Sequence, residues 1–166
     1  MYKSLLLYLG MKEKAIFAAG CFWGVQTSFD GVPGVLETNV GYTGGKTKTP
    51  TYEAVCGGDT GHAEALEVMF DNEKVTYETL VRHFFKMHNP TEYNRQGPDV
   101  GSQYRSAVFF LDNNQKTVAE KVMLDISPTY FPKTIATEVA PFETFYKAEE
   151  YHQKYFEKNG GGTCHV

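Results

Sequence analysis

The order in which strand and helix patterns follow one another constrains the fold of this chain more than any other feature. Short apolar or alternating runs predict strands, and runs with apolar residues three and four positions apart predict helices. The expected strands cover 14–19, 35–42, 62–70, 104–111 and 134–140, and the expected helices cover 22–29, 52–56, 76–88, 113–126 and 145–158. Because the elements mix without strict β-α-β alternation, we predict an α+β fold with helices packed on a mixed, mostly antiparallel sheet.

Length and charge limit what the chain can bind. Its 166 residues correspond to one domain, since domains cluster at about 100–200 residues. We expect a loose leader at 1–13 and a mobile, glycine-rich tail at 159–166. A net charge of −4 supplies no basic surface for a phosphate backbone, and no stretch reaches the roughly 18 apolar residues of a membrane helix. We therefore expect neither nucleic acid nor a membrane as a partner.

The cysteines indicate a reducing compartment. There are three, at positions 21, 56 and 164, which is too few and too scattered for a secreted disulfide framework. Residues 1–10 look like the start of a signal peptide, but the charges of Lys12, Glu13 and Lys14 would interrupt it before any cleavage site. We predict a cytoplasmic protein with free or catalytic thiols.

Cys21 lies where the buried strand 14–19 ends at Gly20 and the first helix begins. Unpaired backbone N–H groups and the positive end of a helix dipole favour a thiolate at such a position. A reactive thiol is therefore our prediction, and an inert core cysteine is the alternative. Phe22 and Trp23 follow directly, and since both cannot point inward, at least one ring should flank the sulfur.

Glu64 stands out in the strand 62–70, where it is in phase with Leu66, Val68 and Phe70. A carboxyl on the apolar face is desolvated, which raises its pKa and allows it to act as a general acid near neutral pH. The alternative is a glutamate at the strand end that reaches water or pairs with a lysine.

The other two cysteines differ in context. Cys164 lies on the glycine-rich tail, where it could travel to another sulfur as a resolving cysteine or be incidental. Cys56 ends the short helix 52–56 inside the long, glycine-rich loop 41–61, and we interpret it as a space-filling residue.

Several familiar motifs are absent. The run Gly41 to Thr47 lacks the spacing of a P-loop and is not followed by a helix. His83 and His88, five positions apart, point to different sides of their helix, and no cysteine pair has C-x-x-C spacing. A zinc site and thioredoxin-like chemistry are therefore not expected in this chain.

One set of motifs points to a known family. Gly20-Cys21-Phe22-Trp23-Gly24 resembles the signature of the A-type peptide methionine sulfoxide reductases. Further blocks similar to that family follow in order at 41–45, 50–56, 60–64 and 96–106, and the resemblance runs from residue 14 to the C-terminus.

This resemblance implies a ferredoxin-like, two-layer core that forms a single catalytic domain and reduces the S epimer of methionine sulfoxide, free or in proteins, without metal, flavin or another cofactor. Cys21 would attack the sulfoxide sulfur, Glu64 would protonate the oxygen, and Cys164 would then form a disulfide with Cys21 that thioredoxin reduces. The family's catalytic residues correspond to Cys21, Glu64, Tyr52, Asp99, Tyr104 and Cys164, and Phe22 and Trp23 would hold the substrate's methyl group.

Two departures from the family and two alternatives remain. Gln26 stands where many relatives have glutamate, and the tail contains one cysteine where some members have two. A second enzyme class would be an acyl hydrolase with Cys21 as nucleophile and one of four histidines as its base. Those histidines are His62, His83, His88 and His152. A non-enzymatic alternative is a module whose aromatic pocket binds a methyl-bearing side chain.

Overall fold

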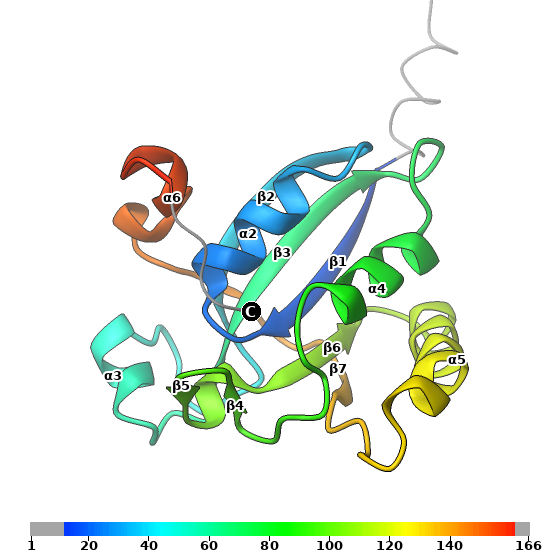
Figure 1. Ribbon diagram of the computed structural model, residues 1–166. Helices are drawn as coiled ribbons and strands as arrows, with labels where there is room; N and C mark the ends of the chain where they lie inside the picture. The colour runs from blue at the N-terminus through cyan, green and yellow to red at the C-terminus, as the bar shows by residue number, and fades with distance from the viewer. Residues whose placement is uncertain (1–11, 162–166) are drawn as a thin grey trace, which may run out of the picture.

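The structure, a computed structural model, describes residues 12–161. A six-stranded sheet with the order β7-β6-β1-β3-β2-β8 forms its centre (Figure 1). Its strands are β1 (Lys12–Ala19), β2 (Val35–Thr43), β3 (Ala63–Asp71), β6 (Ser106–Phe110), β7 (Glu138–Pro141) and β8 (Tyr146–Lys147). Neighbouring strands are antiparallel except β6 and β7, which are parallel. The predicted mixed, mostly antiparallel sheet is confirmed.

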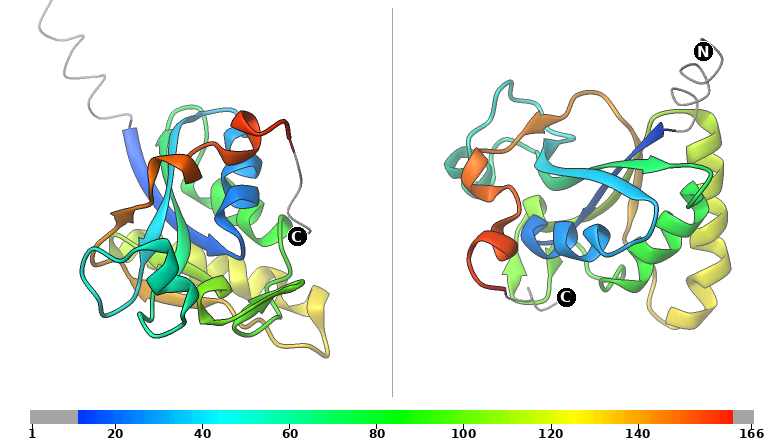
Figure 2. Two further views of the ribbon diagram at one scale, coloured as in Figure 1. Left: turned by 90° about the vertical axis from the view of Figure 1, so that its left-hand side faces the viewer. Right: turned by 90° about the horizontal axis from the view of Figure 1, so that it is seen from above.

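The connections give this sheet a ferredoxin-like core. Helices α2 (Phe22–Asp30) and α4 (Tyr77–Lys86) connect β1 to β2 and β3 to β6. The chain order β1-α2-β2-β3-α4-β6 and the sheet order β6-β1-β3-β2 together make the split β-α-β arrangement. Helix α5 (Asn113–Tyr130) lies beside α4, and the three helices cover one face of the sheet (Figure 2).

Both faces of the sheet are buried. Alternate residues of β1, including Ala15 and Phe17, point to the helices, and Ile16 and Ala18 point to the opposite face. The segment after β7 crosses that second face, where Phe142 and Phe145 pack (Figure 2). Since both faces of β1 are covered, its apolar run is continuous rather than alternating with polar residues.

Local signals fix the helix starts. The side chains of Thr76 and Asp112 cap α4 and α5 by accepting hydrogen bonds from backbone N–H groups of the first turn, at 3.1 and 2.8 Å. Helix α5 continues four residues past its predicted end, and the Tyr130 hydroxyl in its last turn donates to the Phe85 carbonyl oxygen at 3.4 Å. A contact between helices thus extends an element that its own periodicity ends earlier.

The predicted helix at 145–158 is wrong. This segment contains β8, a 3₁₀ turn η2 (Glu150–His152) and only a short helix, α6 (Tyr155–Lys158). The buried Gln153 side chain bonds the backbone N–H and C=O of Val40 and the C=O of Ala148, at 2.9 to 3.0 Å. Lys154 adopts a left-handed conformation with φ of +55°. These tertiary bonds replace the i to i−4 bonds that an uninterrupted helix would need.

The chain ends also refine the prediction. β1 already includes Lys12 and Glu13, which the sequence assigns to the leader. Residues 1–11 and 162–166, and with them Cys164, lie outside the described part of the chain. No helix within residues 12–161 is long and apolar enough to cross a membrane.

Candidate active site

Cys21 directly precedes α2, and a glycine is required to place it there. Gly20 has φ of +85°, and a Cβ added to it would lie 2.7 Å from Cβ of Gln96. Only glycine combines this backbone conformation with so close an approach. The half-buried Cys21 thus lies at the N-terminal end of α2 and beside the loop that carries Gln96.

Glu64 lies on the helix-covered face of β3, as the strand alternation predicts. Its side chain is 3% exposed and in phase with the core residues Leu66, Val68 and Phe70. The β1–β3 ladder ends at the pair Phe17 and Leu66, so Glu64 lies just beyond the paired region, toward the end at which β1 leads into α2.

The tyrosines and the aspartate predicted for the site come from two loops at one end of the sheet. Tyr52 is the first residue of α3 (Tyr52–Cys56), and Tyr104 is the last residue of the 3₁₀ turn η1 (Ser102–Tyr104) rather than part of a strand. Asp99 belongs to a small hairpin of β4 (Arg95–Gln96) and β5 (Asp99–Val100). Figure 1 shows α3 and this hairpin near the N-terminal end of α2.

Electrostatics around Tyr104 show that these groups share one site. Burial raises the pKa of Tyr104 well above its ordinary value, and the negative charges of Glu64, Cys56, Asp99 and Cys21 raise it further. Burial likewise raises the pKa of Tyr52, with contributions from Cys56, Glu64 and Tyr104. Both hydroxyls therefore stay protonated near neutral pH and can donate hydrogen bonds. The structure thus gathers five predicted residues: Cys21, Glu64, Tyr52, Asp99 and Tyr104.

Gln96 holds the hairpin loop in place. Its side-chain amide accepts from the Asn89 N–H and donates to the Asn89 C=O, both at 2.9 Å. The side chain is 4% exposed and lies against Gly20. Because β4 and β5 are so short, these buried bonds rather than strand propensity fix the position of Asp99.

Phe22 and Trp23 diverge, as their successive positions on α2 require. Phe22 is buried against the rings of Tyr42 and His152, with centroids 5.7 and 5.2 Å away. Trp23 is half-buried and stacks on Tyr155 with ring centroids 3.7 Å apart. Trp23 is therefore partly accessible, whereas Phe22 supports the site from the core.

Cys56 differs from its prediction. The interpretation as a space-filling residue is wrong, because Cys56 is exposed at the end of α3. Burial raises the pKa of its thiol, a hydrogen bond with Tyr52 lowers it, and the charge of Glu64 raises it. Cys56 thus belongs to the polar surroundings of the site.

Sequence reasoning assigned no role in this site to three residues beside the cluster: Tyr42, Glu149 and His152. The Tyr42 hydroxyl donates to Glu149 Oε1 at 3.3 Å, and burial together with Glu149 and Glu64 raises the pKa of Tyr42. His152 was considered only as a base for a hydrolase, yet it is 1% exposed and accepts a hydrogen bond from the Trp23 indole. The alternation of β2 puts Tyr42 in phase with Val40 and could have placed it on the core face.

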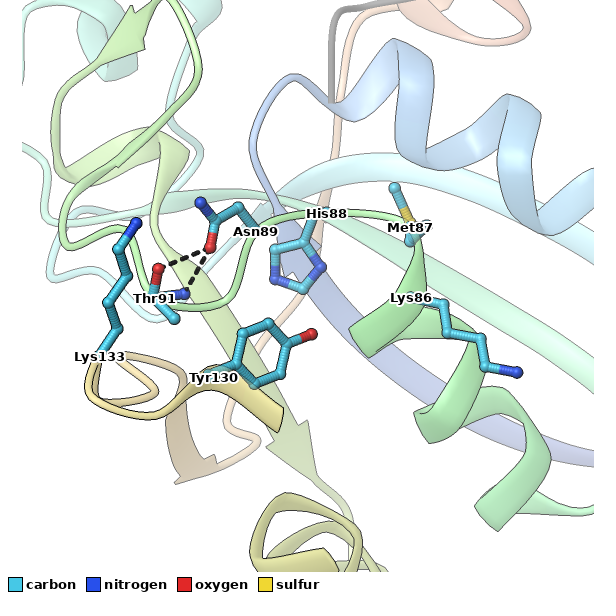
Figure 3. A pocket seen from close by; sticks show the side chains of 7 residues that line it. All are labelled: Lys86, Met87, His88, Asn89, Thr91, Tyr130 and Lys133. Atoms are coloured by element: carbon cyan, nitrogen blue, oxygen red, sulfur yellow. Dashed lines mark hydrogen bonds between the residues drawn. The ribbon is translucent and has the colours of Figure 1, made fainter. Parts of the chain in front are cut away.

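A separate cavity of about 400 Å³ lies beneath the end of α4 (Figure 3). Its lining, as the structure describes it, includes none of the residues that the family resemblance assigns to the site: Lys86, Met87, His88, Asn89, Thr91, Tyr130 and Lys133. Figure 3 shows Lys86 and Lys133 on opposite sides of the Tyr130 ring. Their charges do not converge, so this cavity does not resemble an anion site.

Nor does the described part of the chain offer a metal centre. Within residues 12–161, no group of three or more His, Cys, Asp or Glu side chains could hold a metal ion.

Comparison with known proteins settles the family. A sequence model described as peptide methionine sulfoxide reductase matches residues 13–166. The chain belongs to the peptide methionine sulfoxide reductase family. A peptide methionine sulfoxide reductase MsrA of Methanosarcina mazei is 54% identical over 150 residues, covering 89% of this chain and 71% of that protein.

Solved structures of this family share the fold. Methionine sulfoxide reductase A of Corynebacterium diphtheriae superposes with a TM-score of 0.88 at 37% identity, covering 93% of this chain and 78% of that one. Reduced Mxr1 from Saccharomyces cerevisiae gives 0.86 at 36% identity, covering 93% and 90%. Mxr1 in complex with Trx2 gives 0.63 at 25% identity, covering 88% and 86%.

Membership of the methionine sulfoxide reductases makes this chain an oxidoreductase and excludes both the hydrolase and the purely binding alternative. The four histidines considered as a base for the hydrolase are consistent with this result, since each has a hydrogen bond to a group other than Cys21. His62 bonds Gly45 N–H and the Thr47 carbonyl oxygen, His83 bonds Ser28, His88 bonds the Phe84 carbonyl oxygen and Ser106, and His152 bonds Trp23.

Proposed function

We propose that this enzyme reduces the S epimer of methionine sulfoxide, free and in proteins, with Cys21 as the nucleophile. The observation that carries the proposal is the shared site: Tyr104 lies within electrostatic reach of the Cys21 thiol and the buried Glu64 carboxyl. A thiol at a helix N-terminus is activated as a thiolate, and a carboxyl in an apolar setting keeps its proton. The pair supplies the nucleophile and the acid that the reaction needs.

The reduction step follows from this pairing. The Cys21 thiolate attacks the sulfoxide sulfur, and Glu64 gives its proton to the sulfoxide oxygen. The protonated oxygen then passes from the methionine sulfur to the Cys21 sulfur: the substrate's S–O bond and the new bond between the two sulfurs break, a Cys21 S–O bond forms, and methionine leaves. Cys21 becomes a sulfenic acid, so the cysteine is oxidised by two electrons as the sulfoxide is reduced. Over the whole step the proton moves from Glu64 to the oxygen, and the negative charge moves from Cys21 to Glu64.

The tyrosines support charge development on the oxygen. Tyr52 and Tyr104 remain protonated near neutral pH because burial raises the pKa of each. Preorganised donors aimed at the reacting oxygen are often the largest catalytic contribution, and neutral tyrosines add no charge to repel a carboxyl. Asp99 completes the polar side of the site, and the half-buried Trp23, backed by Phe22, would contact the substrate's methyl group.

Regeneration would use the tail. The Cys164 thiol attacks the Cys21 sulfenic sulfur, which forms a disulfide and releases water, and thioredoxin then reduces the disulfide. The solved complex of the similar Mxr1 with Trx2 supports a thioredoxin as the partner. A reducing cytoplasm, which the scattered cysteines predict, would supply that reductant.

The test compares two epimers and two cysteine variants. With dithiothreitol as reductant and no added cofactor, the wild type should release methionine from the S epimer and not from the R epimer. Cys21→Ser should abolish release, because a serine hydroxyl is not ionised at neutral pH and cannot form a sulfenic acid. Cys56→Ser, the matched cysteine control, keeps a hydroxyl in place of the thiol that hydrogen-bonds Tyr52 and should retain most of the activity. Residual activity of Cys21→Ser within tenfold of the wild type would exclude Cys21 as the nucleophile.

A further inference from the structure

His152 lies at the junction of the site and the C-terminal arm, which we define as residues 148–158. It is 1% exposed and belongs to the turn η2. The Trp23 indole Nε1–H donates to its Nδ1 at 3.0 Å. The centroid of the Tyr52 ring lies 4.5 Å from that of the imidazole. One imidazole therefore contacts a side chain from α2 and a side chain from α3.

The hydrogen bond to Trp23 determines the state of this imidazole. An indole nitrogen can only donate, so Nδ1 of His152 must accept and the proton must be on Nε2. Nε2 lies 3.6 Å from Glu149 Oε2, a carboxylate that favours a proton on this side. A doubly protonated His152 would have a donor on both nitrogens and could not accept from Trp23.

The arm that carries His152 is firmly held. Gln153 bonds the backbone of Val40 through both ends of its amide. The Lys154 N–H donates to the buried Gln26 side chain at 2.7 Å, and Lys154 Nζ lies 2.6 Å from Asp30 Oδ2. His152 thus has a fixed frame from which it can position the indole.

From these contacts we infer that His152 is a positioning residue of the reductase: its neutral imidazole orients Trp23, through the hydrogen bond to the indole, for contact with the substrate. The inference rests on the proposed function, in which Trp23 contacts the methyl group. It predicts that His152 governs substrate affinity more than the rate of the chemical step. In the proposed mechanism Cys21 supplies the nucleophile and Glu64 the proton, and His152 supplies neither.

The charges around His152 give this arrangement a pH dependence. Burial lowers the pKa of His152, against the opposing effect of two carboxylates, Glu149 beside it and Glu53 from α3. Tyr52 from α3 and Tyr151 from the arm also face the ring, whereas Trp23 and Phe22 from α2 do not titrate. Acidification should therefore release Trp23 only below the ordinary histidine pKa of about 6.5.

Kinetics provide the first test. His152→Phe keeps a ring but removes the acceptor, and His152→Asn keeps an acceptor close to the position of Nδ1. With dithiothreitol and methionine S-sulfoxide, His152→Phe should raise KM about three- to tenfold, the size of one lost hydrogen bond, with kcat within about twofold of the wild type by the same argument. His152→Asn should restore most of the KM. An equal loss in both variants, or a fall in kcat alone, would overturn the inference.

Fluorescence provides a second test that needs neither activity nor a folded variant. Trp23 is the only tryptophan, so its emission reports this contact directly. In the wild type the emission should titrate with a midpoint below pH 6.5, and His83→Gln, a control far from the indole in sequence and bonded to Ser28, should titrate identically. Emission whose midpoint lies at or above pH 6.5 would refute the His152 contact. Failure of the wild type to reduce sulfoxide would instead refute the proposed function, while leaving this titration intact.

Discussion

Acidification should destabilise the fold most strongly through His88, which follows α4. Its Nδ1 donates to the Phe84 carbonyl oxygen at 2.6 Å, and its Nε2 is 2.7 Å from the Ser106 hydroxyl oxygen, which is itself 2.8 Å from that of Thr137. The side chain is 6% exposed. Burial lowers the pKa of His88 from 6.5 to about 4, because a charged imidazole would have to be desolvated.

The sign and size of the effect follow from proton linkage. Between pH 6.5 and pH 4 the unfolded chain binds a proton at position 88 that the folded chain does not, so stability falls as the pH falls. A shift from 6.5 to about 4 is worth at most about 3 kcal/mol. About 2 kcal/mol of the free energy of unfolding should be lost between about pH 7 and pH 5.

Urea unfolding of the wild type and His88→Gln at pH 7, 6 and 5 would measure this loss. His88→Gln should be less stable at pH 7 but lose much less stability on acidification. His83→Gln is the control and should remove less of the pH dependence, because His83 is only half-buried. If His88→Gln retains the full slope of the wild type, the reasoning is refuted. Nuclear magnetic resonance of the wild-type imidazole, which should stay neutral down to about pH 5, needs no variant.

Three further predictions concern the site and its loops. Glu64→Gln should slow the single-turnover rate by about 10²–10⁴-fold with little change in binding, because the amide cannot deliver a proton; an unchanged rate would transfer the acid role to another group, with Asp99 next. Cys164→Ser should release about one methionine per protein but lose turnover on thioredoxin, with partial rescue by dithiothreitol; a Cys21–Cys56 disulfide in wild-type mass spectra would contradict this tail mechanism. Gly45→Ala should lower the melting temperature and reduce the free energy of unfolding by about 1–3 kcal/mol, since its Cβ would clash with His62 N and Thr60 O. Gly31→Ala, whose nearest neighbour is 3.7 Å away, is the matched control.

Sequence period and position predicted where the two residues proposed to carry the central chemistry lie. The alternation of β3 placed Glu64 on the buried face, and the strand-to-helix junction placed Cys21 at the start of α2. Both inferences depend only on neighbours in sequence. Each inference can therefore be made without knowing which segments meet in space.

Long-range contacts explain what periodicity missed. The helical pattern at 145–158 is broken because Gln153 bonds Val40, 113 residues earlier in the chain. Tyr52, Asp99 and Tyr104 come from loops whose positions depend on single buried contacts such as Gln96 against Gly20. Only family resemblance could propose these three from sequence, since no local pattern records the contacts that assemble them.

The fold gives Cys21 and Glu64, the two groups proposed to react, opposite environments, and the proposed chemistry requires this. A thiolate and a protonated carboxyl in the same solvent would exchange the proton, because an ordinary carboxyl is the stronger acid. Cys21 begins a helix and keeps part of its surface exposed, so backbone dipoles can stabilise a negative sulfur. Glu64 lies on the core face of a strand, where burial penalises its charge. Moving either group by one residue would reverse its environment, since a one-residue shift sends a strand side chain to the other face and takes a helix residue away from the free N–H groups.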